Sequence, residues 1–200
     1  MSAQALSRGV ARPELTMPEA EAAALRTAYG EARAILEYGS GGSTVLASEL
    51  PGKQVVSVES DADWARMMRA WFALNPGRSP VELIHADIGP TRDWGHPADA
   101  SAWALFPAYP LAVWDRDIAP DVVLVDGRFR AGCALACAFR TRQPLTLLFD
   151  DYVPRGAYHA VEEFLGTPEI IGRMAVFDIS PTPVPSDRLL RVIELTSAPL

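Results

Sequence analysis

Short apolar runs alternate with helix-like stretches through most of this 200-residue chain, and this alternation restricts the fold more than any other feature. Each run is rich in Val, Ile or Leu and ends in polar or acidic residues, as strands buried on both faces do. The runs cover residues 34–36, 54–58, 81–84, 121–125 and 145–149, and the helix-like stretches cover 18–34, 44–50, 61–74, 131–140 and 157–165. The alternation predicts a doubly wound α/β fold, with a mostly parallel sheet covered by helices on both faces.

The pattern changes after Gly166. Residues 173–179 and 188–195 are two further strand-like runs, joined by a proline-rich segment at 180–185. No helix fits between them, so we expect the two runs to pair antiparallel at one edge of the sheet. The whole chain, 1–200, is then a single domain with one seven-stranded sheet.

Two segments fall outside the alternation. Residues 1–15 lack periodicity, and we expect them to form a loose N-terminal arm. Residues 89–120 form an insertion that is too long for an ordinary connection. Three interpretations of it are open: a lid over a site, a cap on the sheet, or a contact between the subunits of a homodimer. The insertion is rich in aromatic residues, namely Trp94, Trp103, Phe106, Tyr109 and Trp114.

Composition narrows the classes of partner. The chain has 25 acidic and 18 basic residues and a net charge of −7, whereas nucleic-acid and anionic-membrane surfaces need clustered Lys and Arg. No apolar run approaches the ~20 residues of a membrane span, and the sequence does not begin with a basic-then-apolar leader. Cys133 and Cys137 would share one helix face as small buried thiols. We therefore expect a cytoplasmic protein with no nucleic-acid or membrane partner, although this balance of charge says nothing about small substrates.

A glycine-rich turn, Glu37-Tyr-Gly-Ser-Gly-Gly-Ser43, directly follows the first predicted strand and precedes a helix. Gly39 and Gly41, with Ser40 between them, let the backbone turn tightly. They also let a cofactor approach the amides at the start of the helix. Taken alone, the turn is explained equally well as purely structural.

Acidic residues also end the second and third predicted strands, at Glu59 and Asp87. Glu59 lies 22 residues (59 − 37) after Glu37 and can accept hydrogen bonds from both ribose hydroxyls of an adenosine. Asp87 can reach the adenine amino group. Acids at the ends of three successive strands surround the crevice where open α/β sheets bind ligands. A solvated strand-end glutamate is the alternative for Glu59 alone.

Two other nucleotide-binding turns fit less well. A nicotinamide-type turn prefers Gly-x-Gly-x-x-Gly, and here Thr44 occupies the last position, where helix packing favours the absence of a side chain. A triphosphate-binding loop needs Gly-Lys-Ser/Thr after the turn, which this sequence lacks. A nicotinamide-dependent oxidoreductase is therefore a weaker interpretation.

The turn instead resembles the class I S-adenosylmethionine-dependent methyltransferase signature, acid-x-Gly-x-Gly-x-Gly, with a departure at Ser43. The resemblance covers about residues 34–195 and includes the terminal antiparallel pair. It implies a Rossmann-like sheet of strand order 3-2-1-4-5-7-6 with an antiparallel seventh strand. It also implies donor contacts: Gly39, Ser40 and Gly41 at the methionine part, Glu59 and Ser60 at the ribose, Asp87 and Ile88 at the adenine, and Glu37 orienting the turn.

Acidic residues follow the fourth and fifth predicted strands as well, at Asp126, Asp150 and Asp151. Their placement resembles that of metal-dependent small-molecule O-methyltransferases, which implies that these three carboxylates hold Mg²⁺. A divalent ion lowers the pKa of an acceptor hydroxyl, and oxygen-only ligands suit Mg²⁺. In the alternative interpretation, Asp126 contacts the donor, Asp150 begins a turn or helix, and Asp151 is exposed.

One position departs from the catechol-type enzymes of that group. Their catalytic lysine, three residues past the first acid, is replaced by Phe129. The flanking Arg128 and Arg130 stay protonated and are poor bases. They are good clamps for a carboxylate or phosphate, or they pair with acids of the protein itself.

The predicted function is methyl transfer from S-adenosylmethionine to a small molecule, at oxygen, with Mg²⁺ as a second cofactor under the metal interpretation. The candidate catalytic residues are Asp126, Asp151 and His159, although a lone helical histidine is more often a surface or core residue. A donor-binding protein without transferase activity is the alternative from another class. A nicotinamide-dependent oxidoreductase is the third interpretation.

Overall fold

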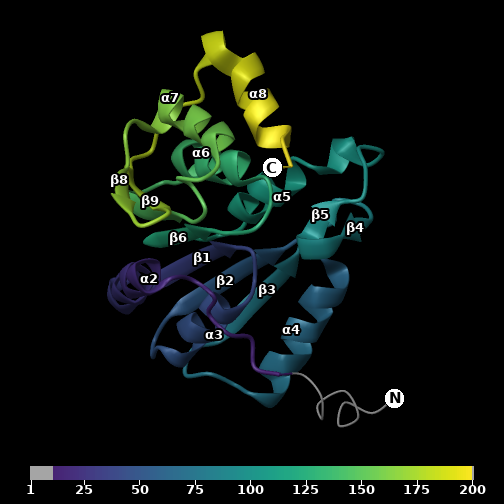
Figure 1. Ribbon diagram of the computed structural model, residues 1–200, viewed down its shortest axis with the longest axis vertical. Helices are drawn as coiled ribbons and strands as arrows, with labels where there is room; N and C mark the ends of the chain where they lie inside the picture. The colour runs from purple at the N-terminus through teal and green to yellow at the C-terminus, as the bar shows by residue number, and fades with distance from the viewer. Residues whose placement is uncertain (1–10, 200) are drawn as a thin grey trace.

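The computed structural model describes residues 11–199 and contains a seven-stranded sheet between two layers of helices (Figure 1). The strand order is β3-β2-β1-β6-β7-β9-β8. The first five of these are parallel, and β9 runs antiparallel to both β7 and β8. The predicted order with an antiparallel seventh strand is confirmed. The strands are β1 (Ala34–Tyr38), β2 (Gln54–Glu59), β3 (Val81–His85), β6 (Val122–Val125), β7 (Leu145–Phe149), β8 (Glu169–Ile171) and β9 (Met174–Ile179).

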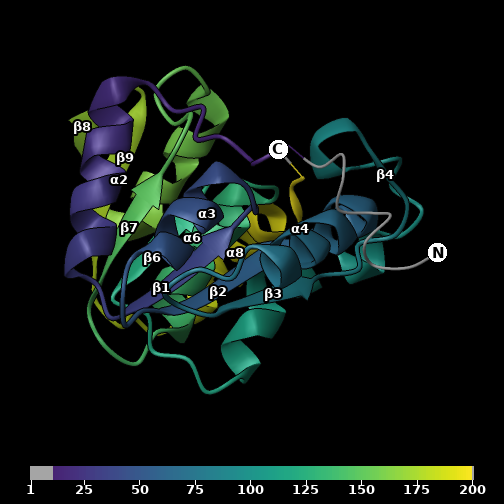
Figure 2. The ribbon, with the colours of Figure 1, turned by 90° about the horizontal axis from the view of Figure 1, so that it is seen from below.

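The central strands are buried on both faces, which explains their continuous apolar runs. All residues of β6 are buried, for example, and its alternate side chains enter two separate cores. Val123 packs with one helical layer and Leu124 with the other. The two layers lie on opposite faces of the sheet (Figures 1 and 2): α2 (Glu19–Glu31), α3 (Gly42–Glu49) and α4 (Ala62–Leu74) on one, and α5 (Ala108–Leu111), α6 (Arg130–Arg140), α7 (Glu162–Leu165) and α8 (Leu189–Ser197) on the other.

Helix α6 is the most deeply buried helix of the layer that covers β6 and β7. Cys133 and Cys137 lie on it as free, buried thiols, as predicted. Gly132 lets α6 approach α8 closely, because a Cβ at that position would lie 2.8 Å from the carbonyl oxygen of Thr196. The predicted helix at 157–165 is instead a 3₁₀ segment, η4 (Gly156–Val161), followed by the single turn of α7.

The predicted strand at residues 188–195 is wrong. A 3₁₀ turn, η5 (Ser186–Arg188), leads into helix α8, which packs on α6. Val192, Leu195 and Thr196 are its buried residues, spaced three and four apart as one helical face. β-Branched and leucine residues suit either structure, and the neighbouring α6 selects the helical one.

The antiparallel pair at the edge of the sheet is formed by β8 and β9. The strand that pairs with residues 174–179 therefore comes before them in the sequence, and not after them at 188–195. Ile171 of β8 is opposite Met174 of β9, which leaves a two-residue turn, Gly172–Arg173. Gly172 has φ +58°, a left-handed conformation that suits glycine. The predicted antiparallel pairing of residues 174–179 at this edge of the sheet is therefore correct, but the predicted partner strand is wrong.

The central part of the aromatic insertion, residues 106–114, packs on the sheet. Phe106, Tyr109 and Trp114 are buried in the core with α6, and the Trp114 indole donates a 2.7 Å hydrogen bond to the Tyr38 hydroxyl. Trp94 and Trp103 remain exposed. Besides α5, the insertion contains a short hairpin, β4 (Thr91–Arg92) and β5 (His96–Pro97), and three 3₁₀ turns, η1 (Asp93–Gly95), η2 (Trp103–Leu105) and η3 (Ala112–Asp115).

The expected loose arm is only partly described. Residues 1–10 lie outside the described residues, whereas 11–15 are placed beside the start of α3. The backbone of Glu14 and Leu15 fills the space that a Cβ on Gly42 would need. This part of the arm is therefore packed against the glycine turn.

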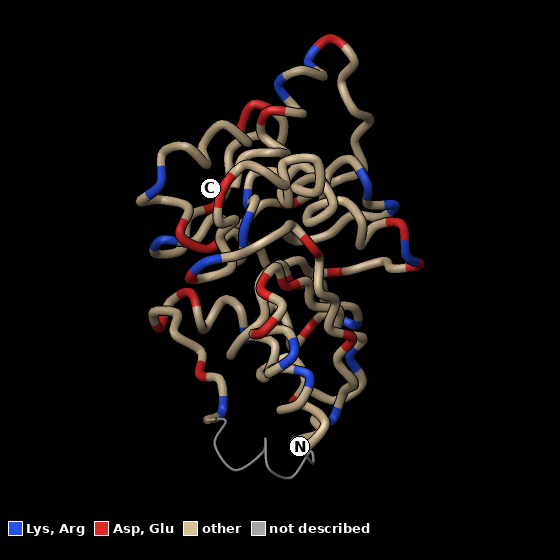
Figure 3. Tube along the Cα trace, turned by 90° about the vertical axis from the view of Figure 1, so that its right-hand side faces the viewer, with Lys and Arg blue, Asp and Glu red and all other residues tan. Residues whose placement is uncertain are grey.

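The described part of the chain contains no helix long and apolar enough to cross a membrane. Acidic and basic residues are interspersed along the trace (Figure 3). Mixed charge of this kind differs from the clustered Lys and Arg that phosphate backbones attract.

Candidate functional site

A cavity of about 250 Å³ lies at the carboxyl ends of β1, β2 and β6. Strand order reverses between β1 and β6, and the crevice at such a switch point is where open α/β sheets bind ligands. A larger hollow, of about 560 Å³, lies between α2 and the opposite ends of the strands. We assign the candidate site to the smaller cavity because it lies at the switch point, between the glycine turn and the strand-end acids; it is lined by Gly39, Glu59, Ser60, Asp61, Trp64, Trp94, Gly95, Asp126, Gly127 and Arg128.

The glycine turn forms one wall of the cavity. Gly39 has φ +99°, and a Cβ there would lie 2.8 Å from the backbone N and Cα of Gly127. Only glycine fits this contact, which joins the turn after β1 to the turn after β6. Gly41 has nothing within 4 Å of its Cβ position, and its amide donates to the Thr44 hydroxyl at 2.9 Å. The turn is thus an open backbone cradle at the start of α3, of the kind that accepts a cofactor.

Glu37 lies beneath this turn and is fully buried. The Tyr29 hydroxyl donates a 2.7 Å hydrogen bond to its Oε1, while Oε2 has no hydrogen-bond partner among the described residues. Burial raises the pKa of this carboxyl. Glu37 therefore supports the turn from the core side, and it does not line the cavity.

Glu59 has a structural role that its sequence position did not reveal. Its Oε1 accepts hydrogen bonds from the amides of Ser60 (2.7 Å) and Asp61 (2.9 Å), and its Oε2 accepts one from Ser40 (3.1 Å). Burial raises the pKa of Glu59, and these backbone hydrogen bonds oppose the rise. A carboxylate has about four acceptor positions, so Oε2 keeps capacity for one more hydrogen bond at the cavity wall.

The hairpin of the insertion closes another side of the cavity. The Ser60 hydroxyl donates a 2.9 Å hydrogen bond to the Gly95 carbonyl, and Gly95 packs directly on this hydroxyl. Trp94, with φ +62°, is 85% exposed at the rim. Trp64 on α4 also lines the cavity, and its indole donates to the Ser40 carbonyl at 2.8 Å. Sequence reasoning missed both the Gly95 contact and the Trp64 wall.

The predicted adenine contacts lie outside the cavity lining. Asp87 is exposed and accepts a 2.9 Å hydrogen bond from the Gly89 amide. Ile88 is fully buried in the core beneath the insertion. Their role with a donor stays a prediction.

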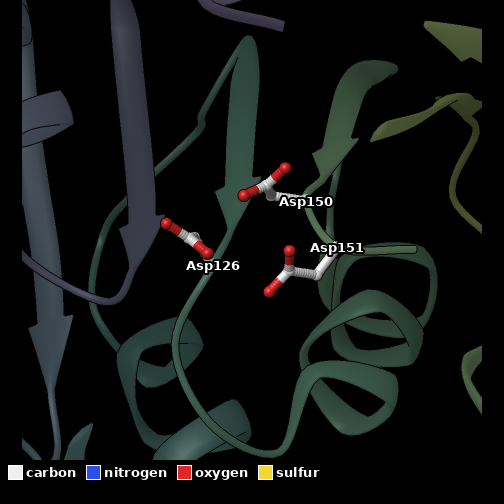
Figure 4. A group of neighbouring side chains, drawn as sticks. All are labelled: Asp126, Asp150 and Asp151. Atoms are coloured by element: carbon white, nitrogen blue, oxygen red, sulfur yellow. The ribbon is translucent and has the colours of Figure 1, made fainter. Parts of the chain in front are cut away.

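The three aspartates after β6 and β7 do come together. The side chains of Asp126, Asp150 and Asp151 point toward one another (Figure 4), with one oxygen of each within 4.8 Å of the others. Asp150 is fully buried, whereas the Asp126 side chain is 38% exposed. The convergence of acids at these two strand ends is as the sequence predicted.

Arginines neutralise this cluster. Arg173 forms a two-point ion pair with Asp150, with distances of 2.9 and 2.6 Å. Arg130 lies 3.2 Å from Asp126 and 3.5 Å from Asp151, and Arg155 lies 3.0 Å from Asp151. Three guanidinium groups thus occupy the space and balance the charge that a divalent ion would need. The residues do not fit the predicted Mg²⁺ site, because its three ligands are already ion-paired.

Asp126 is the aspartate of the cluster that lines the cavity. Burial raises its pKa to about 6; Arg130 opposes this rise, while Asp150 and Asp151 add to it. The carboxylate is therefore ionised at neutral pH and yet a stronger proton acceptor than an ordinary aspartate.

The remaining catalytic candidate, His159, is not among the lining residues. Its ring packs against Tyr152, with the centroids 4.8 Å apart, and its Nε2 lies 3.3 Å from the Tyr152 carbonyl oxygen. A different histidine, His96 on β5, contacts the Arg128 side chain at the cavity. The sequence offered no signal for that pairing, since the two residues are 32 positions apart.

A doubly wound sheet with an antiparallel edge pair and a glycine turn at its switch point is the arrangement that the resemblance to class I, Rossmann-like methyltransferases implied. The chain belongs to this family. It is 60% identical to a methyltransferase-like protein from Silicibacter pomeroyi, over 94% of this chain and 99% of that one, with a TM-score of 0.90. No protein-family model and no curated protein matches the sequence.

More distant structures are also similar. The N-terminal domain of EvdMO1 with SAH and D-fucose is 14% identical, over 97% of this chain and 83% of that one, with a TM-score of 0.44. The 16S rRNA N2 G1207 methyltransferase of Thermus thermophilus, in complex with AdoMet and guanosine, is 15% identical, over 81% and 40%, with a TM-score of 0.42. These scores are too low to support an argument about this chain.

Proposed function

We propose that this chain transfers a methyl group from S-adenosylmethionine to an oxygen atom of a small molecule. One observation carries the proposal: a single cavity joins the glycine turn after β1 to Asp126 after β6. A methyl donor bound at the glycine turn would therefore lie in the same cavity as Asp126, the proposed acceptor of the proton. Membership of the methyltransferase family supports the donor, and a net charge of −7 favours a small molecule over a nucleic acid.

Residues of the chain fit the donor as follows. The open backbone at Gly39 and Gly41 would receive its methionine part, and the remaining acceptor position of Glu59 Oε2 would receive a ribose hydroxyl. Ser60 holds the hairpin wall beside the ribose position. Asp87 and Ile88 remain the predicted adenine contacts.

When bound, S-adenosylmethionine supplies a methyl group on a positively charged sulfur. Asp126 would accept the proton of the acceptor hydroxyl, and the oxygen of that hydroxyl would take the methyl group from the bound donor. Arg130, 3.2 Å away, orients the Asp126 carboxylate. Asp151 is held by Arg130 and Arg155, which suits anchoring of the loop better than proton transfer.

Calorimetry with S-adenosylhomocysteine and NAD tests the donor assignment. We expect S-adenosylhomocysteine, the demethylated form of the donor, to bind to the wild type. Glu59→Ala should weaken this binding at least about tenfold, or ~1.4 kcal/mol. Glu82→Ala, at an exposed position on β3, is the control. Tight binding of NAD without binding of the methyl donor would overturn the proposal.

Mass spectrometry of cell extract incubated with methyl-labelled donor tests the transfer. A labelled small molecule that forms with the wild type and not with Asp126→Asn supports the enzyme. Donor binding with no labelled product in any extract would favour the alternative, a donor-binding protein without transferase activity.

A further inference from the structure

Arg128 is a buried cation that lines the cavity. It is 7% exposed, and its Nε has no hydrogen-bond partner among the described residues. Its Nη1 contacts His96 Nε2, and its backbone amide donates to the Tyr109 hydroxyl at 3.4 Å. The guanidinium therefore reaches the cavity with much of its hydrogen-bonding capacity unused.

The arginines of the aspartate cluster already have carboxylate partners. Arg130, Arg155 and Arg173 pair with the three aspartates of the cluster, whereas Arg128 forms no ion pair within residues 11–199. Burial lowers the pKa of Arg128, and the positive charges of Arg130 and Arg155 lower it further. Burial and the charge of Arg128 likewise lower the pKa of His96, which favours a neutral ring that accepts from Nη1.

A buried guanidinium without a counter-charge is unfavourable, and an oxyanion relieves that penalty through parallel hydrogen bonds. Arg128 and Asp126 line the same cavity and are two positions apart on the turn after β6, and the Arg128 side chain contacts His96 of the hairpin. An acceptor bound in this cavity can therefore meet both side chains.

We propose that the methyl acceptor carries a carboxylate or phosphate group and that the Arg128 guanidinium binds it. This inference rests on the proposed function. Arg128 is a specificity-determining residue in this scheme, and His96 positions its side chain. An uncharged acceptor of the same shape would leave the guanidinium buried and unpaired, and so would bind more weakly.

Binding of inorganic phosphate and of acetate tests the proposal. Each anion is titrated at constant ionic strength with and without saturating S-adenosylhomocysteine, and occupancy is followed by the melting temperature. We expect saturable binding of at least one anion to the wild type, and Arg128→Gln to weaken it at least about tenfold. The anion that binds more tightly identifies the acceptor group.

Two further variants make the result specific. Arg142→Gln removes the same charge at an exposed position and should leave anion binding unchanged. Arg128→Lys keeps the charge without the planar fork, and should bind phosphate better than acetate. It also keeps the test valid if Arg128→Gln does not fold.

The outcomes separate this inference from the proposed function. If S-adenosylhomocysteine does not bind the wild type, the proposed function fails. If it binds, but neither anion does, or both bind Arg128→Gln as well as the wild type, the anion site is refuted. Loss of S-adenosylhomocysteine binding in Arg128→Gln, with methylthioadenosine binding intact, would assign Arg128 to the carboxylate of the donor and overturn the acceptor site.

Discussion

Replacing Asp126 by asparagine should stabilise the protein at neutral and alkaline pH. Burial is the main reason that the pKa of Asp126 rises from 3.8 to about 6. The difference corresponds to about 3 kcal/mol of destabilisation by the ionised carboxylate. Because the side chain is 38% exposed, solvent screening lowers this figure, and we expect about 1 kcal/mol.

The sign follows from proton binding. The pKa of Asp126 in the folded chain exceeds its value of 3.8 in the unfolded chain, so the folded state holds the proton more tightly. The stability that protonation provides is complete below about pH 4 and is lost as the pH rises through about 6. The Asp126→Asn variant has no charge to gain, so its advantage over the wild type should grow between about pH 5 and pH 8.

Urea unfolding of both proteins at these two pH values measures the effect. Asp117→Asn is the matched control, since Asp117 is fully exposed and its nearest cation lies 3.9 Å away. A wild type that is as stable as Asp126→Asn near pH 8 would refute the reasoning about burial. Methyl transfer should be lost in the same variant and should rise through about pH 6 in the wild type; retained transfer would refute the role of Asp126 as base.

The other predictions concern the cavity and its supports. Gly39→Ala should destabilise the fold by about 2 kcal/mol in urea unfolding and abolish donor binding, because φ is +99° and the new Cβ meets Gly127. Arg173→Met should cost about 3–5 kcal/mol by leaving Asp150 buried and unpaired, and adding Asp150→Asn should restore most of that stability. Millimolar Mg²⁺ should not raise the melting temperature, and a rise reversed by chelation would contradict the arginine pairing. The two buried cysteine thiols should react with a thiol reagent far more slowly than a free peptide thiol, whereas equal rates would show that α6 opens readily.

The layered sheet was predictable because its signal is local. Each parallel strand is a continuous apolar run, and each connection carries a helical pattern or a glycine turn, so no long-range information is needed. Asp61 illustrates this: it sits just before α4 and accepts hydrogen bonds from the amides of Asp63 and Trp64, as an N-cap residue does. Strand order then follows from family resemblance and from the handedness of the crossovers.

Residues 189–197 show where local signals fail. The segment Leu-Leu-Arg-Val-Ile-Glu-Leu has both strand-forming and helix-forming residues. Which of its residues are buried depends on the element that it packs against, and that element is α6. Gly132 of α6 has no side chain, so the backbone of Thr196 can approach it closely. Tertiary packing decided between the two structures.

Some residues of the site could be predicted from the sequence and others could not. The carboxylates at strand ends were predictable because the carboxyl ends of neighbouring parallel strands lie at the same edge of the sheet. Their arginine partners were not, because Arg173 is 23 residues from Asp150 and reaches it only through the β8–β9 turn. Metal-ligand residues and ion-paired residues have the same sequence pattern, and the cations that occupy the space distinguish them.

The arrangement of charge links the two proposals. Three carboxylates and three arginines pair at the ends of β6 and β7, which leaves Arg128 as a cation at the cavity without a carboxylate partner among the described residues. A divalent ion would place more positive charge beside it, whereas an anionic acceptor would neutralise it. Pairing that anion with Arg128 would also fix the acceptor relative to Asp126, because both residues line one cavity and are two positions apart. Fixed orientation of the acceptor hydroxyl is what proton transfer and in-line methyl transfer both require. Under the two proposals, ion pairing with arginine would supply the positioning that the predicted Mg²⁺ would otherwise have supplied.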